Sequence, residues 1–348
     1  MGAGGGGGDG LAPAWEDLDA PGSGGAGCFA DENAFAPLPE PRCVVASVTV
    51  LPARLPGFRR VLRSLLRQSR PPDYVFVVLP ERITDRSGRL RLHTYPEPLP
   101  SYLFGDARVR VLRPGLGEDL GTLDMLIPTL RALRDSPPPG CPGPQRVWVG
   151  NDDQIYDPGL LEALLTCAAR HHDGACGSEG GWGYYATLRG LATLGGRALA
   201  AGLRPFVRAG GDIQVEWLQS MGGLLYRTDF FGDDFLAGPP GDADDLVLLE
   251  NDWWFAGYLK SRGVPLLHLP LVRKWARPAR LSSQDALSHG WWRIGQNPAK
   301  DEVIRYYAAR HGFWREECAG ALAHDLCQFD VTADGVPGPG APTDAASG

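Results

Sequence analysis

Three polar side chains, Asn151, Asp152 and Asp153, follow directly after the apolar segment "RVWVG" at residues 146–150. An aspartate pair at the end of a buried strand suits a hard divalent cation, because Mg²⁺ and Mn²⁺ take carboxylate oxygens and fill their other positions with water and substrate phosphates. A cation held there would neutralise a diphosphate leaving group. The alternative is a turn or a helix cap, since Asn and Asp are ordinary turn residues. The stretch alone leaves both interpretations open.

A second group of acids lies in "ENDWWFAGYLKSRGVP", where Glu250 and Asp252 adjoin a strongly apolar, aromatic segment. Acids among Trp, Phe and Leu are costly to bury, so they need partners or a cleft. A carboxylate there could serve as a general base whose pKa is raised by its surroundings. The alternative is a helix cap and first-turn acids of a helix that begins at Asn251 or Asp252, with the two Trp residues in the core.

Aromatic side chains are numerous, and aromatic faces pack well on sugar rings. We expect most of them in the core and a minority in a binding cleft. His268, in "PLLHLP", is either a further metal ligand or a satisfied core residue, and a single His amid Leu favours the core. The aromatic candidates are Trp182, Tyr184, Tyr185, Trp217, Trp253, Trp254, Trp291 and Trp292.

Strands that alternate with helices must position these groups. "CVVASVTVL" at 43–51 is typical of a strand covered on both faces, and the segment 56–72 places Phe, Val and Leu at helical spacing. Further strands are predicted at 73–80, 108–114, 146–150 and 264–269, and further helices at 120–135, 157–172, 246–263 and 299–313. This order predicts one doubly wound, Rossmann-like, mostly parallel α/β sheet, in which ligands bind beyond the carboxyl ends of the strands. Residues 151–153 occupy that place.

Composition limits the function classes. The chain has 348 residues, 43% of them hydrophobic, and a formal net charge of -7. An acidic balance argues against sequence-independent nucleic-acid binding, which needs a basic face. No stretch reaches the length of a membrane span, and the N-terminus lacks the regions of a signal peptide. We therefore expect a soluble globular protein that is cytoplasmic or peripherally associated with a membrane.

The seven Cys residues show no paired metal-ligand spacing, so we expect most of them to be buried thiols rather than a disulfide scaffold. The Gly- and Pro-rich residues 1–40 and 331–348 are predicted to be disordered. A phosphate-loop interpretation of the poly-Gly run fails, because no strand precedes it and no Lys-Ser/Thr follows.

Five segments in order resemble the nucleotide-diphospho-sugar glycosyltransferases of the A-type fold, distantly similar to glycosyltransferase family two. They are "SVTVLPARLPGFRRVLRSLLRQSRPPDYVFVVLPE", "YPEPLPSYL", "DLGTLDM", "NDDQIYDP" and "NDWW". The similarity covers about residues 43–315. It implies a domain at 41–330, with a nucleotide-sugar half at 41–157 and an acceptor half at 158–330.

The resemblance also implies roles for matching residues. Asp153 would be the usual metal ligand, with Asn151 in the place of a residue that contacts ribose or metal and Asp152 between them. Asp252 would be the base that deprotonates the acceptor hydroxyl. Nucleotide contacts would come from Pro52, Arg54, Asp119 and Gly121, and acceptor contacts from Trp217, Gly222, Gly223 and Trp253.

The expected function is therefore transfer of a sugar from a nucleotide-diphosphate donor, with a UDP-sugar as the default, to a carbohydrate or other hydroxyl acceptor. Mn²⁺ or Mg²⁺ would assist, and the outcome would be inversion. Asn151 and Asn251 each replace an Asp of the family pattern, and Thr122 and Met125 stand where Pro and Lys are expected. These departures favour the alternative of a non-catalytic carbohydrate-binding or scaffold relative. A sugar nucleotidyltransferase is a further alternative, although "LPARLPG" is a poor nucleotide loop for one.

Overall fold

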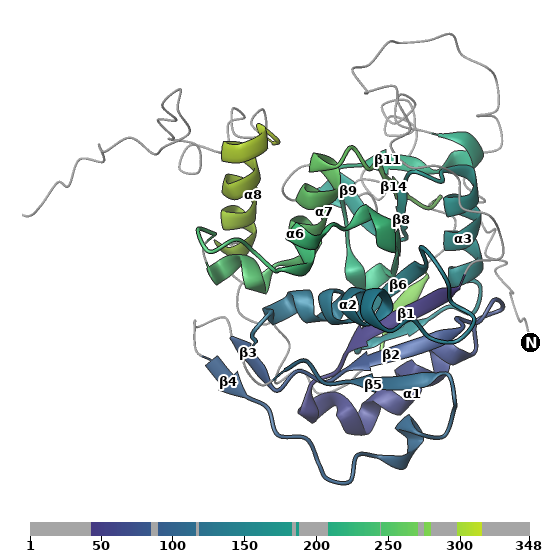
Figure 1. Ribbon diagram of the computed structural model, residues 1–348. Coiled ribbons are helices and arrows are strands. Elements are labelled where there is room, and N and C mark those ends of the chain that lie inside the picture. Colours follow the sequence, from purple (N-terminus) through teal and green to yellow (C-terminus); the bar gives the residue numbers. More distant parts are fainter. Residues whose placement is uncertain are drawn as a thin grey trace, which may run out of the picture.

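A computed structural model of the chain describes most of the region between the two Gly-rich ends (Figure 1). The expected disorder at 1–40 and 331–348 lies outside the described residues, as do the aromatic candidates Tyr184, Tyr185, Trp291 and Trp292. The described residues are 43–84, 90–115, 118–182, 186–187, 208–243, 245–270, 275–279 and 298–314.

One sheet of eight strands forms the centre, in the order β11-β14-β8-β13-β6-β1-β2-β5. Six strands run in the same direction, and β13 and β11 run against them. This confirms the predicted α/β, Rossmann-like, mostly parallel sheet. The strands are β1 (Val44–Thr49), β2 (Tyr74–Val78), β5 (Val109–Leu112), β6 (Arg146–Asn151), β8 (Ala175–Gly177), β11 (Ile213–Val215), β13 (Leu224–Arg227) and β14 (Leu266–His268).

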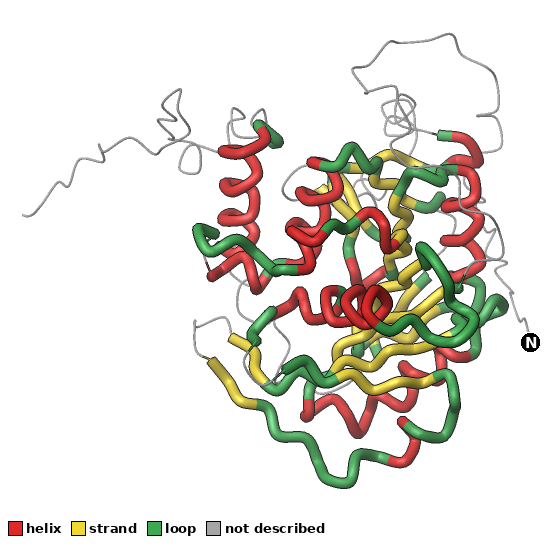
Figure 2. The backbone as a smooth tube through the Cα atoms, viewed as in Figure 1, coloured by secondary structure: helices red, strands yellow, loops and turns green. Residues whose placement is uncertain are grey.

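Helices cover both faces of the sheet, as Figure 2 shows. The side chains of Val44, Ala46 and Val48 pack with α1 and α3, whereas Val45 packs with α2, α7 and α8 on the other face. This explains the unbroken apolar run of the first strand, because a strand buried on both faces has no solvent side. The helices are α1 (Leu55–Leu66), α2 (Ile127–Asp135), α3 (Leu160–Arg170), α6 (Asp233–Leu236), α7 (Asn251–Ser261) and α8 (Pro298–His311).

Short strands lie outside the main sheet. β9 is the central strand of a three-stranded sheet, and two further pairs of strands flank the core. These strands are β3 (Arg82–Thr84), β4 (Leu90–Leu92), β7 (Gln154–Tyr156), β9 (Gly180–Trp182), β10 (Ala186–Thr187), β12 (Trp217–Leu218) and β15 (Ala276–Pro278).

The predicted helix at 120–135 is two elements rather than one. Its first part is the 3₁₀ helix η3 (Gly121–Met125), and α2 begins only at Ile127. Pro128 is the physical reason, because proline lacks an N–H and clashes with the carbonyl four residues earlier, so it is tolerated only in the first turn of a helix. The break makes η3 a segment separate from α2.

Two disulfides correct the expectation of buried thiols. Cys43 before β1 is joined to Cys141 in the loop before β6, and Cys167 of α3 is joined to Cys176 of β8. The spacing of the Cys residues does not indicate these pairs, because folding of the sheet brings the partners together. Cys28, Cys318 and Cys327 lie outside the described residues.

No helix in the described part of the chain combines the length and apolar character needed to cross a membrane.

Candidate functional site

The carboxyl ends of β1 and β6 lie side by side. Thr49 is paired with Asn151 in the parallel register. The chain proceeds from β1 outward to β2 and β5 on one side and returns to β6 on the other, so the order of the strands reverses between β1 and β6. A crevice at such a reversal is where open α/β sheets bind ligands. The 3₁₀ helix η1 (Pro52–Arg54) after β1 therefore faces residues 151–153.

Tyr156 fixes the chain just after β6. Its hydroxyl accepts a hydrogen bond from the Asn151 N–H at 2.6 Å and donates one to the Asn151 carbonyl at 3.4 Å. Gly150 allows this approach, because a Cβ at that position would lie 2.6 Å from the tyrosine hydroxyl. The Tyr in this segment is thus a positioning residue that orders the polar triplet against the end of the strand.

Arg54 contacts both carboxylates of the triplet. Its Nη1 forms an ion pair with Oδ1 of Asp152 and lies 3.4 Å from Oδ2 of Asp153. Burial raises the pKa of Asp152 to about 6, while the positive charge of Arg54 acts in the opposite direction. The Asp152 side chain is 6% exposed and that of Asp153 is 33% exposed, so the pair opens to solvent on the Asp153 side.

Unsatisfied oxygens remain at this edge of the sheet. Oδ1 of Asn151 and Oδ2 of Asp152 are both buried without a hydrogen-bond partner within the described residues. A buried polar atom without a partner is uncommon and costs free energy unless a ligand or water satisfies it. Two carboxylates and one amide oxygen fit the donor set of Mg²⁺ or Mn²⁺, which takes one or two carboxylates besides water and phosphate oxygens. The described residues hold no cluster of three acids, His or Cys that could bind a metal by themselves.

The 3₁₀ helix η3 lies over the same edge. Asp119 accepts a hydrogen bond from the Gly121 N–H at 2.9 Å, and Thr122 donates one to the Leu248 carbonyl at 2.9 Å. Gly121 has a φ of +52°, and a Cβ there would lie 2.2 Å from the Leu248 oxygen. The structure therefore gives Asp119 and Gly121 a role in shaping η3 against the 3₁₀ helix η8 (Asp245–Leu249).

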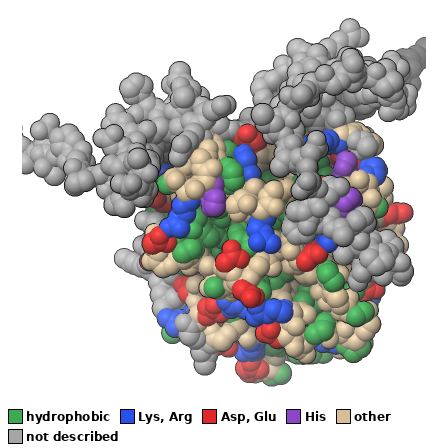
Figure 3. All heavy atoms as spheres, turned by 45° about the horizontal axis from the view of Figure 1, so that its top comes forward, with side chains coloured by type: hydrophobic (Ala, Val, Ile, Leu, Met, Phe, Trp, Pro, Cys, Tyr) green, Lys and Arg blue, Asp and Glu red, His purple; other side chains and the backbone are tan. Residues whose placement is uncertain are grey.

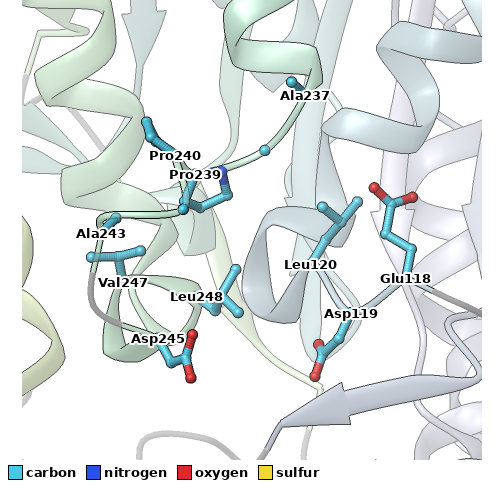
Figure 4. Close-up of a pocket in the computed structure, with 12 residues that line it drawn as sticks. Glu118, Asp119, Leu120, Ala237, Pro239, Pro240, Ala243, Asp245, Val247 and Leu248 are labelled. Carbon is cyan, nitrogen blue, oxygen red and sulfur yellow. The ribbon is translucent and has the colours of Figure 1, made fainter.

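An open pocket of about 220 Å³ lies on the outer side of η3. Figure 4 shows Asp119 and Asp245 on opposite sides of it, with Leu248 between them and Leu120 above Asp119. Neither Arg54 nor the triplet at 151–153 lines this pocket. Its acidic lining is unsuited to a diphosphate, so the pocket is not the centre of the candidate site.

Asp252 lies in the first turn of α7, and Glu250 is the residue just before that helix. The helix predicted at 246–263 begins only at Asn251, because residues 245–249 form the separate 3₁₀ helix η8, and this start agrees with the alternative of a helix from Asn251 or Asp252. Oδ1 of Asp252 accepts hydrogen bonds from the Ser220 N–H at 2.9 Å and from the Asn251 side-chain amide at 2.8 Å. Desolvation, followed by the charge of Glu250, raises the pKa of Asp252 to about 7. A carboxylate with a pKa near neutrality is suited to proton transfer.

Asp252 is connected to the strand edge through side-chain contacts. The Asn251 amide also donates to Sδ of Met125 at 3.0 Å, and the Met125 carbonyl accepts a hydrogen bond from Ser47 at 2.6 Å. Ser47 belongs to β1 and is paired with Val149 of β6. Hydrogen bonds therefore link the start of α7 to η3, and η3 to β1.

The four residues expected to bind an acceptor are buried. The Trp217 and Trp253 rings stack at 5.7 Å, and Nζ of Lys300 lies 4.1 Å from the centre of the Trp253 ring. A Cβ at Gly222 or Gly223 would lie 2.5 Å from Glu179 or 2.8 Å from Trp148, respectively. These positions support the Ser220 loop that holds Asp252.

The other single candidates occupy the core. Trp254 packs against Tyr306 and Tyr307. His268 is 1% exposed, and its Nδ1 contacts the Leu269 carbonyl. The position of His268 agrees with the core interpretation.

Asp124 was not predicted as a site residue. It is 2% exposed on η3, and its Oδ2 has no hydrogen-bond partner in the described part of the chain. Burial, followed by the charges of Asp119 and Glu118, raises the pKa of Asp124 well above its ordinary value. Burial, followed by the charges of Asp124 and Asp152, raises the pKa of Tyr95, whose hydroxyl donates to the Val50 carbonyl at 2.8 Å. The only sequence signal was an acid between Leu123 and Met125.

The outer surface carries mixed charge. On the face drawn in Figure 3, acidic and basic side chains lie interspersed.

Comparison with known proteins yields a fold similarity alone. No protein-family model matches the sequence. No curated protein matches it either. Among solved structures, the chain is similar to the mannosyltransferase PcManGT from Pyrobaculum calidifontis in complex with GDP-Man and Mn²⁺, with 16% identity and a TM-score of 0.39. The match covers 69% of this chain and 58% of that chain, so this chain spans less than two thirds of the length of the neighbour. No family membership follows from these comparisons.

Proposed function

We propose that the chain is a glycosyltransferase that moves a sugar from a nucleotide-diphosphate donor to a hydroxyl acceptor. The observation that supports this most is the convergence of Arg54 with Asp152 and Asp153 at the reversal of strand order, together with the contacts that tie Asp252 to the same edge. An aspartate pair that can hold a divalent cation, beside an arginine, is suited to a diphosphate. A carboxylate whose pKa is raised to about 7 is suited to deprotonating a hydroxyl.

The proposed donor side consists of η1, η3 and the triplet. Pro52 and Arg54 belong to η1, Asp119 and Gly121 shape η3, and a UDP-sugar is our default donor. Asp153 and Asn151, together with Asp152, would hold Mn²⁺ or Mg²⁺. When bound, the metal would supply positive charge to the diphosphate that leaves.

Asp252 is the proposed catalytic base. Its carboxylate accepts the proton of the acceptor hydroxyl while that oxygen forms a bond to the anomeric carbon. The bond between this carbon and the diphosphate oxygen breaks, and its electron pair leaves with the diphosphate. Ser220 and Asn251 hold Oδ1, which leaves Oδ2 outside these two hydrogen bonds. A base on the face opposite to the leaving group gives inversion.

Calorimetric titration with UDP and GDP, each with and without Mn²⁺, tests the donor site. We expect metal-dependent binding of one nucleotide by the wild type and a loss of at least about ten-fold in affinity for Asp153→Ala. Asp135→Ala is the matched control, because Asp135 is 64% exposed at the end of α2. Absence of binding to either nucleotide under all conditions would contradict the proposal.

A second candidate is a non-catalytic carbohydrate-binding protein of the same fold. The observation in its favour is that Arg54 already neutralises the carboxylates proposed for the metal. Hydrolysis of the donor sugar by water separates the two functions. A transferase releases some nucleotide from the donor without acceptor, and Asp252→Asn abolishes that release if Asp252 also activates the water, whereas a binding protein releases none with or without Mn²⁺.

A further inference from the structure

Arg54 occupies the position of a counter-ion. Its guanidinium forms an ion pair with Asp152 and lies 3.4 Å from Asp153. The Arg54 side chain is 11% exposed, so the contact is largely withdrawn from water. Two neighbouring carboxylates that are partly buried repel each other and require a compensating positive charge. In the structure, Arg54 supplies that charge.

A divalent cation would bind the same two carboxylates. A guanidinium and a metal ion at the same oxygens repel each other, because both are cations in a site with reduced access to water. Binding of the metal and retention of the ion pair are therefore competing states. The competition requires movement of a side chain alone, since Arg54 lies at the junction of η1 and α1, where the backbone is fixed by helical hydrogen bonds.

We propose that Arg54 is the counter-ion of Asp152 and Asp153 in the free protein and becomes a diphosphate-binding residue when a divalent cation displaces it. This inference rests on the proposed function and narrows the nucleotide contact that the resemblance implies for Arg54 to the diphosphate. Guanidinium groups bind phosphate oxygens in a two-pronged geometry, and this ligand is available only after the donor has arrived. The exchange makes metal binding weak without a nucleotide and strong with one.

Arg54→Gln tests the first half of the exchange. The protein is titrated with Mn²⁺ alone, and the electron paramagnetic resonance signal of the free ion is measured at each step. This titration gives the affinity for the metal without any nucleotide. We expect Arg54→Gln to bind Mn²⁺ at least about ten-fold more tightly than the wild type, because the competing cation is gone. Arg59→Gln is the matched control, since Arg59 is exposed on α1 and the variant makes the same change of charge. An affinity of Arg54→Gln equal to that of the wild type would overturn the exchange.

Binding of UDP and of inorganic pyrophosphate at saturating Mn²⁺ tests the second half. We expect Arg54→Gln to weaken both ligands by at least about ten-fold, because the lost contact is to the diphosphate. Tighter Mn²⁺ binding with unchanged affinity for both ligands would overturn the diphosphate role. If the wild type binds neither UDP nor GDP, the proposed function fails, while the Mn²⁺ titration still decides whether Arg54 competes with the metal.

The variant leaves two carboxylates without their counter-ion, so its folding must be checked. Thermal unfolding with and without Mn²⁺ provides this check, and we expect Mn²⁺ to raise the Tm of Arg54→Gln more than that of the wild type. Arg54→Lys is the second variant, which retains the charge but lacks the planar fork. It should bind Mn²⁺ about two- to five-fold more tightly than the wild type, and an affinity equal to that of the wild type would contradict the exchange even if Arg54→Gln does not fold.

Discussion

The side-chain amide of Asn251 donates a hydrogen bond to Oδ1 of Asp252 over 2.8 Å. A donor to a carboxylate favours its charged form and lowers the pKa, whereas desolvation and the neighbouring Glu250 raise it. The net result is a pKa of about 7 for Asp252. Asn251 is thus a hydrogen-bond partner of the proposed base.

The pH dependence of transfer follows from this pKa. A base must be deprotonated to accept a proton, so we expect kcat/KM for the donor to rise with pH and to level off above about 7, near the pKa of Asp252. Asp252→Asn should lower kcat by at least about 100-fold. Initial rates of sugar transfer between about pH 5 and about pH 9 measure this dependence. A rate independent of pH in the wild type would remove Asp252 from the role of base.

Asn251 and Glu250 should shift that profile in opposite directions. Asn251→Asp removes a donor and adds a like charge, so the pKa of Asp252 rises and the acid limb moves to higher pH. Glu250→Gln removes the charge that helps to raise the pKa, so the acid limb moves to lower pH. Rate profiles of the two variants provide the measurement. Shifts of the same sign would show that the limb reports a group other than Asp252.

The layers of the fold could be predicted from the sequence because each element has a clear apolar period. The first strand and the helix after it were predicted at 43–51 and 56–72, and they are found at Val44–Thr49 and Leu55–Leu66. The break before α2 was not predicted, because the apolar period continues through Pro128. The spacing of apolar residues therefore predicts where a helix or strand lies better than it predicts where a helix is broken.

The chemistry of the site was harder to predict, because it depends on contacts between distant residues. The polar triplet was identified from its place after a strand, but the ion pair with Arg54 joins residues 98 positions apart. Asp124 carries no motif, and its pKa is raised by the burial that folding imposes. The glycines at 222 and 223 could be noticed in the sequence, but only the neighbouring side chains show that they are packing positions.

Asp124 should make stability depend on pH. Its pKa is raised in the folded state, so its stabilising contribution is complete below the ordinary pKa of an unfolded Asp, about 3.9, and is lost as pH rises through the folded value. Asp124→Asn removes this dependence. We expect the variant to have a higher Tm than the wild type at pH 8, by about 2–4 °C for each kcal/mol gained, and little difference near pH 4. Thermal unfolding at both pH values measures this, and an equal effect at each would contradict it.

The Cys43–Cys141 disulfide should contribute more stability than Cys167–Cys176. The two pairs are separated by 98 and 9 residues, and the chain-entropy estimate is about 4.7 kcal/mol for a loop of about 100 residues and about 2.6 kcal/mol for one of about 10. Dithiothreitol should therefore lower the Tm of the wild type, and lower it less in the double variant Cys43→Ala/Cys141→Ala than in Cys167→Ala/Cys176→Ala.

Mass spectrometry of the unreduced protein after alkylation establishes whether these four thiols are protected. Protection would place folding of the chain in an oxidising compartment rather than in the cytoplasm expected from the sequence, because the cytosol keeps such thiols reduced. Alkylation of all four in protein purified without reductant would contradict both disulfides and return the chain to the cytosolic expectation. Protection combined with equal Tm losses in the two double variants would instead show that the difference in loop length does not determine their contributions.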